Sequence, residues 1–267
     1  MKEIKLIASD IDGTLIPDST PDLYPEMVAA IPKLVKQGIL FCAASGRQYW
    51  SIRNVFREVE EELVYLAENG AHIRYKGKDI RVVPMKREYA EGIMKQLRQY
   101  YDTCDVVVST PEGSLVESKK KDFIDLLTYG YHNKFRQVED VLAEKADIVK
   151  IAVYQKDSIR QLGEGTLIPA WTERVKVCMA GEEWVDFMDA SVDKGHGLEF
   201  IQDYFHIKKE ETMAFGDNDN DIGMMQAAGE SYAVENAREE VKAAAKNVCP
   251  SYTDKGVYRI VKGLLED

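Results

Sequence analysis

Residues 4–14, which read IKLIASDIDGT, join a near-continuous apolar run to two aspartates that lie two positions apart. Such a run predicts a strand buried on both faces, as in a parallel sheet. Ligands of open parallel sheets bind beyond the carboxyl ends of the strands, where Asp10 and Asp12 stand. Two carboxylates at this spacing point the same way along extended chain, and they suit a hard cation such as Mg²⁺. A simple turn at Asp12-Gly13, with Asp10 as a helix cap, is the competing interpretation.

The rest of the chain shows two different patterns. Residues 1–83 and 190–267 alternate apolar strands with amphipathic helices, which predicts an α/β fold with a doubly wound, parallel, Rossmann-like core sheet. Residues 84–189 contain paired strands joined by short turns, which predicts an inserted α+β domain. The expected helices include residues 119–132 and 138–145 in the insert and residues 237–247 in the core.

The charge balance excludes some partners. The 267 residues hold 35 Lys and Arg against 46 Asp and Glu, a formal net charge of −11. Nucleic-acid binding needs a basic surface, so we expect no nucleic-acid partner, and an anionic substrate looks disfavoured at first. No apolar run approaches the length of about 18 residues that predicts a membrane span. The first residues lack a signal-peptide pattern, so we expect a cytoplasmic protein.

A second acidic cluster, GDNDND at Gly216–Asp221, follows the apolar run at residues 212–215. It also stands at the carboxyl end of a predicted strand, so Asp217 is expected to face the first cluster. A calcium loop of the EF-hand type needs Gly and Glu where this chain has Ile222 and Ala228, so that alternative fails. A plain helix cap by Asn220 or Asp219 stays open and is compatible with a functional role.

Two further features suit a phosphate ligand. Ser45-Gly46-Arg47 ends the second predicted strand and offers a hydroxyl, a backbone N–H and a guanidinium. Lys194 opens the helix that returns the chain to the core pattern, although a lysine at a helix start is often only solvated. The chain has no Gly-x4-Gly-Lys-Ser/Thr loop and no G-x-G-x-x-G motif, which excludes nucleoside-triphosphatase and dinucleotide-binding functions of those types.

In their order along the chain, SDIDGTL, AASGR, the lysine of DKG and GDNDND resemble the four motifs of the haloacid dehalogenase superfamily of phosphohydrolases. The Asn69-Gly70-Ala71 turn and the large insert are similar to the Cof-type branch, which carries an α/β cap. The resemblance covers the whole chain. Ser45 stands where many relatives have Thr, and it keeps the hydroxyl. The stretch SYAVEN at Ser231–Asn236 differs from the Gly-rich stretch of relatives, which leaves the role of Asn236 open.

The resemblance implies roles for these residues. Asp10 would attack the substrate phosphorus and form an aspartyl-phosphate, and Asp12 would act as general acid and base. Mg²⁺ would be held by Asp10, the backbone carbonyl of Asp12 and Asp217, with Asp221 in support. The groups implied to hold the phosphoryl oxygens are Ser45, the Gly46 amide, Lys194 and Asn220.

The function implied is a Mg²⁺-dependent phosphatase that hydrolyses small phosphomonoesters such as sugar phosphates. A phosphosugar mutase or phosphotransferase of the same superfamily and a silent phosphate-binding protein are the alternatives. The cap would set substrate choice, with Arg47, Trp50 and Glu182 as candidates for substrate contact, although Trp50 also suits simple helix packing. The expected partner is a small phosphorylated metabolite rather than nucleic acid or membrane, and the expected state is a monomer or small homo-oligomer. A bound cation with Lys194 would reverse the local charge, so acidity does not exclude an anionic substrate.

Overall fold

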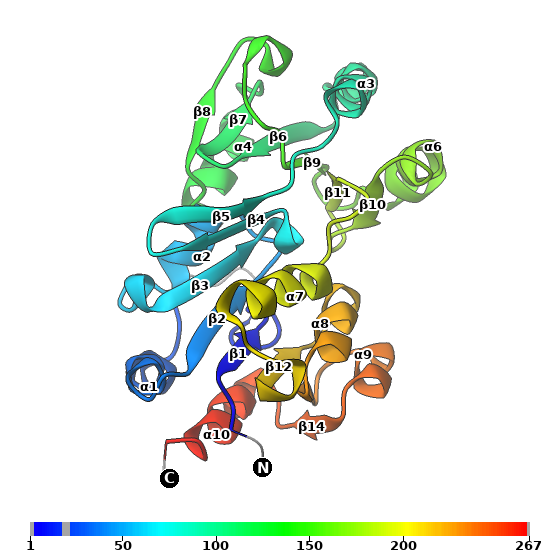
Figure 1. The fold of residues 1–267 in the computed structure, drawn as a ribbon. Coiled ribbons are helices and arrows are strands. Elements are labelled where there is room, and N and C mark those ends of the chain that lie inside the picture. Colours follow the sequence, from blue (N-terminus) through cyan, green and yellow to red (C-terminus); the bar gives the residue numbers. More distant parts are fainter. Residues whose placement is uncertain (1–2, 18–21, 266–267) are drawn as a thin grey trace. The chain divides into compact units, whose positions relative to one another are not determined.

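The fold is described on a computed structural model that covers residues 3–17 and 22–265. The chain forms two compact units (Figure 1). The first, which we call the core unit, comprises Met1–Arg81 and Asp193–Asp267, and the second, the insert unit, comprises Val82–Val192. The two sites where the chain passes between the units lie close to residues 84 and 189, where the sequence pattern changes.

The core unit is built on one largely parallel sheet, with the strand order β14-β13-β12-β1-β2-β3-β4-β5. Its first half along the chain consists of β1 (Leu6–Ser9), β2 (Leu40–Ala44), β3 (Leu63–Ala67), β4 (His72–Tyr75) and β5 (Lys78–Val82). Its second half consists of β12 (Thr212–Gly216), β13 (Glu230–Val234) and β14 (Asn247–Cys249). Every pairing from β14 to β3 is parallel, and β4 pairs antiparallel with β3.

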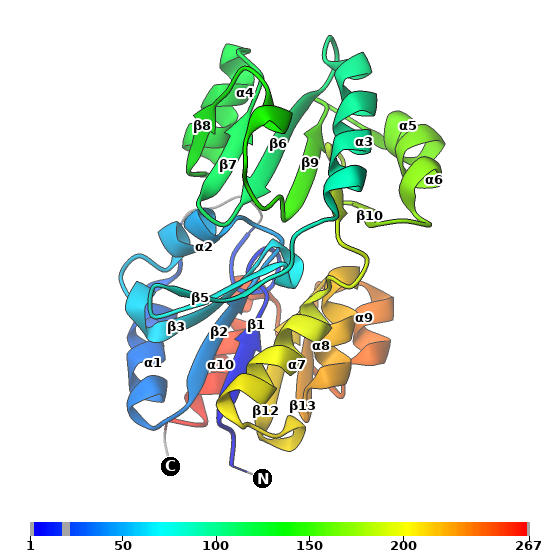
Figure 2. The ribbon, with the colours of Figure 1, turned by 45° about the horizontal axis from the view of Figure 1, so that its top comes forward.

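Helices cover both faces of this sheet, as the sequence predicts for a doubly wound α/β fold. Figures 1 and 2 show α1 and α10 on one face and α7, α8 and α9 on the other. The helices of the unit are α1 (Pro25–Lys36), α2 (Tyr49–Val55), α7 (Lys194–Phe205), α8 (Ile222–Ala227), α9 (Glu239–Ala244) and α10 (Gly256–Lys262). Among the described residues no helix has the length and apolar character needed to cross a membrane.

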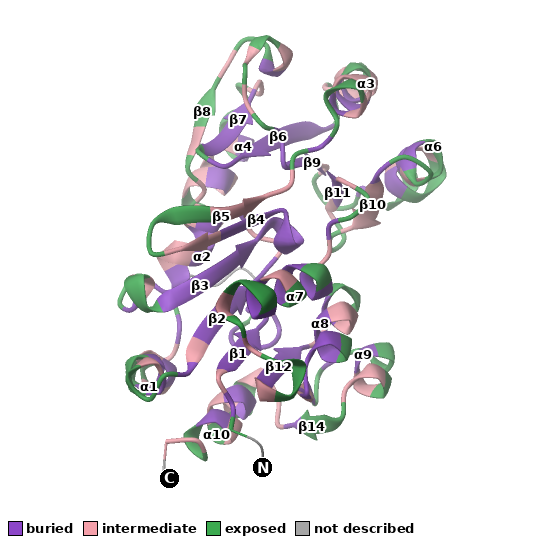
Figure 3. Ribbon diagram, viewed as in Figure 1, coloured by how far each residue is buried: buried purple, intermediate pink, exposed green. Residues whose placement is uncertain are grey.

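Local sequence explains the central elements. All four residues of β1 and all five of β12 are buried, because helices cover both sides of these strands (Figure 3). Helix α1 begins at Pro25, whose missing N–H costs nothing in the first turn. It buries Met27, Ile31 and Leu34 at helical spacing, and that stripe joins the core cluster.

The insert unit has its own sheet, with the strand order β10-β11-β9-β6-β7-β8. Its pairings are antiparallel except for β7 with β8. The strands are β6 (Asp105–Thr110), β7 (Gly113–Val116), β8 (Phe135–Gln137), β9 (Lys150–Tyr154), β10 (Lys176–Met179) and β11 (Trp184–Met188). The helices are α3 (Arg87–Leu97), α4 (Lys121–Asp125), α5 (Arg160–Leu162) and α6 (Ile168–Trp171).

Two segments of the insert unit differ from the helices that the sequence predicts. Residues 138–145 contain only one 3₁₀ turn, at Val141–Ala143, after the short strand β8. The turn is held by tertiary contacts, since Val141 donates its N–H to Glu117 at 2.8 Å and Arg98 pairs with Asp140 at 2.5 Å. In residues 119–132, α4 continues into a π-helical turn at Leu126–Gly130.

The predicted helix at residues 237–247 is too long. Helix α9 ends at Ala244, and Asn247–Cys249 forms β14 instead. This strand pairs with β13 in parallel register, with Ala233 opposite Val248. Sheet pairing therefore decided the conformation of a segment whose local sequence permits a helix.

Candidate active site

Three neighbouring parallel strands end at residues that the sequence selected. In the sheet β12, β1, β2 and β3 lie side by side, and Ser9 is in register with both Phe215 and Ala43. Asp10 follows β1, Asp217 follows β12, and Ser45 follows β2. The chain runs outward in opposite directions from β1 and β12, so this edge is a topological switch point, where open α/β sheets bind ligands.

Three carboxylates gather at this edge, and the set differs from the predicted one, because Asp221 joins Asp10 and Asp217 while the Asp12 side chain does not. Asp10, Asp217 and Asp221 each offer an oxygen, and these oxygens lie within 4.8 Å of one another. The loop after β1 supports the arrangement, because Thr14 donates its hydroxyl to Asp217 at 2.8 Å. Gly13 has φ +75°, and a Cβ there would lie 2.5 Å from Asp217 Oδ2, so only glycine fits the approach of the two loops.

The predicted cation of the site is the fully buried ammonium of Lys194. Its Nζ donates to Asp10 Oδ1 at 2.5 Å and to Asp221 Oδ1 at 2.7 Å. Asp193 caps helix α7 by accepting the N–H of His196, which fixes the first turn and with it the position of Lys194. The solvated alternative for this lysine is wrong, because none of its side chain is exposed.

Negative charge exceeds positive charge in this cluster, since three carboxylates share one ammonium. Burial raises the pKa of Asp10 well above its usual range, and the charge of Asp221 adds to the effect. Burial and Asp221 likewise raise the pKa of Asp217 to about 6. Burial alone would lower the pKa of Lys194, but the charges of Asp10 and Asp221 outweigh it and raise that pKa above 10.5. A divalent cation with oxygen ligands fits this donor set and its excess charge.

Asp221 has little capacity left for a metal. Its Oδ1 accepts from Lys194, and its Oδ2 accepts the backbone N–H groups of Asp217 at 3.0 Å and Asn218 at 3.1 Å. Both oxygens therefore hold other parts of the site in place. This geometry suits the supporting role that the sequence gave to Asp221, with Asp10 and Asp217 as the direct ligands.

Arg47 lies against the carboxylate of Asp12. Its Nε donates to Asp12 Oδ2 at 2.7 Å, and a second nitrogen, Nη2, donates to Asp12 Oδ1. The side chain of Arg47 is 10% exposed and that of Asp12 is 28% exposed. The sequence offered Arg47 as a substrate contact, and it did not reveal this bidentate pair within the core unit. Asp12 is not a member of the three-carboxylate cluster through its side chain.

The predicted phosphate-binding groups lie on adjacent loops. Ser45 is buried, and its hydroxyl oxygen accepts the N–H of Arg47 at 3.0 Å. Asn220 lies on the exposed turn after β12, and its amide donates to Asn69 Oδ1 at 2.9 Å. Asn69 was noticed in the sequence only as part of a turn that resembles relatives.

Asn236, whose role the sequence left open, supports the loop after β1. Its side-chain amide donates to the backbone carbonyl of Gly13 at 2.7 Å. Because this bond joins residues 223 positions apart, no local pattern reveals it. It restrains the loop that carries Asp10 and Asp12.

Trp50 and Glu182, the other candidates for substrate contact, each have partners within their own unit. Trp50 packs on the core cluster, with its ring 5.0 Å from the ring of Tyr49. Glu182 lies on the exposed turn between β10 and β11, where it accepts from Ser158 at 2.7 Å and pairs with Arg160 at 3.2 Å. Their role as substrate contacts stays a prediction.

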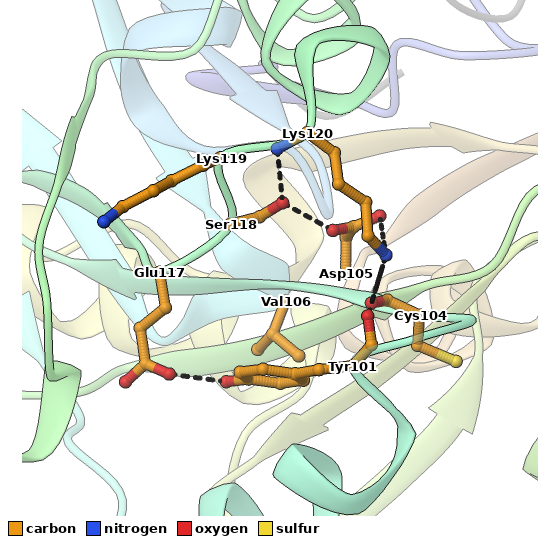
Figure 4. A pocket seen from close by; sticks show the side chains of 8 residues that line it. All are labelled: Tyr101, Cys104, Asp105, Val106, Glu117, Ser118, Lys119 and Lys120. Carbon is orange, nitrogen blue, oxygen red and sulfur yellow. Dashed lines mark hydrogen bonds and ion pairs between the residues drawn. The ribbon is translucent and has the colours of Figure 1, made fainter.

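A separate pocket of about 260 Å³ lies within the insert unit (Figure 4). Its acidic groups already have protein partners: Glu117 accepts from Tyr101 at 2.8 Å, and Asp105 accepts from Ser118 at 2.6 Å. The residues that line it are Tyr101, Cys104, Asp105, Val106, Glu117, Ser118, Lys119 and Lys120, and none was predicted as a site residue.

Several known proteins are similar to this chain over nearly its whole length. A relative from Escherichia coli named 5-amino-6-(5-phospho-D-ribitylamino)uracil phosphatase is 27% identical, over 98% of this chain and 97% of that protein. A Bacillus subtilis protein of the same name is 24% identical, over 96% of each chain. A crystal structure from Eubacterium rectale is 36% identical, with a TM-score of 0.88 and coverage of 98% of this chain and 99% of that one.

A model of one protein family matches nearly the whole chain. The model of the haloacid dehalogenase-like hydrolases matches residues 7–261, a span that includes every loop of the site and the entire insert unit. This confirms the resemblance found in the four sequence motifs. The chain therefore belongs to the haloacid dehalogenase-like hydrolases, and it is a phosphoric monoester hydrolase of that family.

Proposed function

We propose that this protein is a Mg²⁺-dependent phosphatase that hydrolyses small phosphomonoesters through an aspartyl-phosphate on Asp10. The observation that carries the proposal is the pairing of the Asp10 carboxylate with Lys194 at 2.5 Å inside a buried acidic cluster. A carboxylate used as a nucleophile toward an anionic phosphate needs compensating positive charge nearby.

The residues that would hold the metal are Asp10, Asp217 and the backbone carbonyl of Asp12, with Asp221 holding the loop after β12. The raised pKa values of Asp10 and Asp217 support this, because burial and the charge of Asp221 oppose ionisation of both carboxyl groups, and a bound cation would favour it. When bound, a divalent ion supplies charge neutralisation and orientation for the phosphoryl group.

The reaction has two steps. In the first, an oxygen of Asp10 forms a bond to phosphorus while the bond from phosphorus to the alcohol oxygen breaks, and Asp12 gives that oxygen a proton. In the second, Asp12 takes a proton from water, the water oxygen bonds to phosphorus, and the Asp10 carboxylate is released with inorganic phosphate. The groups that would hold the phosphoryl oxygens are the Ser45 hydroxyl, the Gly46 amide, the Lys194 ammonium and the Asn220 amide.

The substrate class we propose is a phosphorylated sugar or sugar alcohol. Support comes from the two relatives named 5-amino-6-(5-phospho-D-ribitylamino)uracil phosphatase, since that compound carries its phosphate on a ribityl chain. We further propose that the insert unit sets the choice of leaving group, because the core motifs supply only groups suited to phosphate and metal.

The proposal is tested by measuring phosphate release from a panel of sugar phosphates, sugar-alcohol phosphates and 5-amino-6-(5-phospho-D-ribitylamino)uracil, with Mg²⁺ or with excess EDTA. We expect release with Mg²⁺, reversible loss with EDTA, and no turnover by Asp10→Asn while circular dichroism shows an intact fold. Turnover in EDTA would refute the metal dependence, and turnover by Asp10→Asn would refute the nucleophile. Isomerisation of a hexose phosphate without phosphate release would favour the mutase alternative.

A further inference from the structure

A short turn after β3, Glu68–Gly70, touches three of the loops that form the site. It belongs to the core unit and is buried throughout. The turn contains Asn69, which is only 6% exposed. The function proposed above gives this residue no role.

The first contact joins the turn to the loop after β2. Asn69 donates its backbone N–H to the carbonyl of Ser45 at 3.0 Å, and Glu68 donates to the carbonyl of Arg47 at 3.0 Å. Gly46 lies between them, and a Cβ placed on Gly46 would lie 3.3 Å from both amide atoms of Asn69. The Asn69 amide therefore packs directly beside the Gly46 backbone.

The second contact joins the turn to the loop after β12. Asn220 Nδ2 donates to Asn69 Oδ1 at 2.9 Å, across 151 positions of sequence. Asn220 is exposed while Asn69 is buried, so the buried amide restrains the exposed one. An exposed amide without such a bond would sample several rotamers and lose entropy when it binds a ligand.

The third contact joins the turn to the start of α7. Gly70 has φ +99°, and a Cβ there would lie 2.7 Å from the backbone carbonyl of Asp193. Asp193 directly precedes Lys194 and caps its helix. The turn thus lies in van der Waals contact with the segment that presents the Lys194 ammonium.

The backbone of the turn has an unfavourable conformation. Glu68 and Asn69 have φ of 50° and 56°, and Gly70 follows with φ +99°. Left-handed backbone costs roughly 1–2 kcal/mol for each residue that carries a side chain. Asn tolerates this conformation better than most residues, but two consecutive residues with side chains adopt it here. Strained backbone of this kind is typical of functional sites.

We propose that Asn69 is a positioning residue, whose side-chain amide sets the Asn220 amide and the Gly46 backbone in the geometry that holds a phosphoryl group. The inference rests on the proposed function, since it names what organises that phosphate site. Asn69 acts through Asn220 and Gly46, and the phosphate binds to those groups.

The variant Asn69→Gly tests the side chain without disturbing the backbone, because glycine adopts φ near 56° readily. We expect kcat/KM for p-nitrophenyl phosphate with Mg²⁺ to fall about tenfold to a hundredfold, the range found when outer-shell supports of a site are removed. The matched control is His206→Gly, which makes the same change at a left-handed residue (φ 57°) at the far end of α7. We expect its kinetics to equal those of the parent protein.

A double-mutant cycle separates positioning from general stability. Because Asn69 acts partly through Asn220, Asn69→Gly should cost less in the background of Asn220→Ala than in the parent protein, and the part that acts through Gly46 should remain. Two independent effects would multiply instead. A thermal melt of each variant, together with circular dichroism, shows whether the fold is kept.

Binding of inorganic phosphate, measured by calorimetry with Mg²⁺ present, distinguishes failure of this inference from failure of the proposed function. Weaker phosphate binding by Asn69→Gly supports the inference even if the parent protein hydrolyses none of the esters. Parent-like binding and kcat/KM in Asn69→Gly, or multiplicative effects in the double mutant, would overturn it while leaving the phosphatase function standing. A parent protein that neither binds phosphate nor hydrolyses esters would overturn both.

Discussion

Arg47 holds the carboxylate of Asp12 with two hydrogen bonds from one guanidinium, the bond from Nε measuring 2.7 Å. Bidentate pairs of this kind fix orientation as well as charge. Asp12 is the residue proposed to give a proton to the leaving group and then to take one from water. The orientation of that carboxylate therefore depends on a residue that the sequence offered only as a substrate contact.

Replacing Arg47 should harm the enzyme in a way that depends on the leaving group. In Arg47→Gln the Asp12 carboxyl group loses the partner that fixes its orientation, so it is less often placed to give a proton to the leaving oxygen. We expect kcat/KM for a sugar-alcohol phosphate to fall by about a hundredfold, because a poor leaving group needs the proton. The fall for p-nitrophenyl phosphate should be several times smaller, since p-nitrophenolate leaves readily without a proton.

Arg53→Gln serves as the control for this experiment. Arg53 forms a comparable pair with Glu60 at 2.5 Å on the same unit, and that carboxylate has no proposed part in catalysis. Equal losses for both substrates in Arg47→Gln would show that Arg47 does not act through Asp12.

Lys194→Ala should reduce both activity and stability. Removal of one electrostatic stabiliser typically costs about a hundredfold to a thousandfold in kcat. The same change leaves Asp10 and Asp221 buried without their cation, which costs about 3–5 kcal/mol in a buried pair. Lys5→Ala is the matched control, because Lys5 pairs with Glu211 at 2.6 Å but is 43% exposed. A near-normal kcat in Lys194→Ala would contradict the electrostatic role.

The dependence of kcat on pH should show no step caused by deprotonation of Lys194. Burial alone would lower the pKa of Lys194, but Asp10 and Asp221 raise it above 10.5. The ammonium therefore stays protonated through the alkaline range in which ordinary lysines begin to titrate. We therefore expect the fall in kcat between pH 8 and pH 10, if there is one, to be the same in the parent protein and in Lys194→Arg. A fall that is present in the parent protein and absent in Lys194→Arg would contradict the assignment.

Mg²⁺ should stabilise the protein more at neutral pH than in mild acid. Burial and Asp221 raise the pKa of Asp217 to about 6, whereas an unfolded Asp titrates near its ordinary value of 3.8. The folded state holds the extra proton, so the free energy of unfolding of the metal-free protein falls as pH rises from about 4 to about 6. A metal ligand must be deprotonated, so Mg²⁺ restores stability only above that range.

Thermal melts with Mg²⁺ and with EDTA, at pH 5 and pH 7.5, measure this difference. We expect a larger rise in Tm with Mg²⁺ at pH 7.5, and a much reduced rise in Asp217→Asn at either pH. Glu211→Gln changes an acidic residue of the core unit whose carboxylate pairs with Lys5 instead, and its response should match the parent protein. An equal rise at both pH values in the parent would argue against Asp217 as a ligand.

Asn236→Ala should weaken metal binding more than it weakens folding. The lost bond, from Asn236 Nδ2 to the Gly13 carbonyl at 2.7 Å, restrains the loop between Asp10 and Thr14. We expect the Mg²⁺ concentration for half-maximal activity to rise about tenfold, in line with other supports of metal ligands. Asn247→Ala removes a side chain with weak contacts at 3.4 Å on the edge strand and should leave this concentration unchanged. An unchanged Mg²⁺ requirement in Asn236→Ala would show that the loop holds without the bond.

The sequence by itself predicted that Asp10, Ser45 and Asp217 follow neighbouring strands, and at which edge of the sheet they meet. Asp10, Ser45 and Asp217 each follow an apolar run that predicts a parallel strand. Parallel strands bring their carboxyl ends to one edge of the sheet, so the sequence alone predicts that these residues meet there. The alternation of strands and helices likewise predicted the doubly wound core. Local patterns failed at residues 138–145 and 237–247, where sheet pairing and side-chain contacts from distant segments decided the conformation.

Only the tertiary structure decided which side chains hold the site residues in place. Arg47 reaches Asp12 across 35 positions, Asn69 accepts from Asn220 across 151, and Asn236 donates to Gly13 across 223. Such partners are set by strand order and by the close packing of loops, and neither has a periodicity that a single sequence displays. The chemistry of this protein lies in residues that a motif reveals, while their geometry depends on neighbours that only the fold brings together.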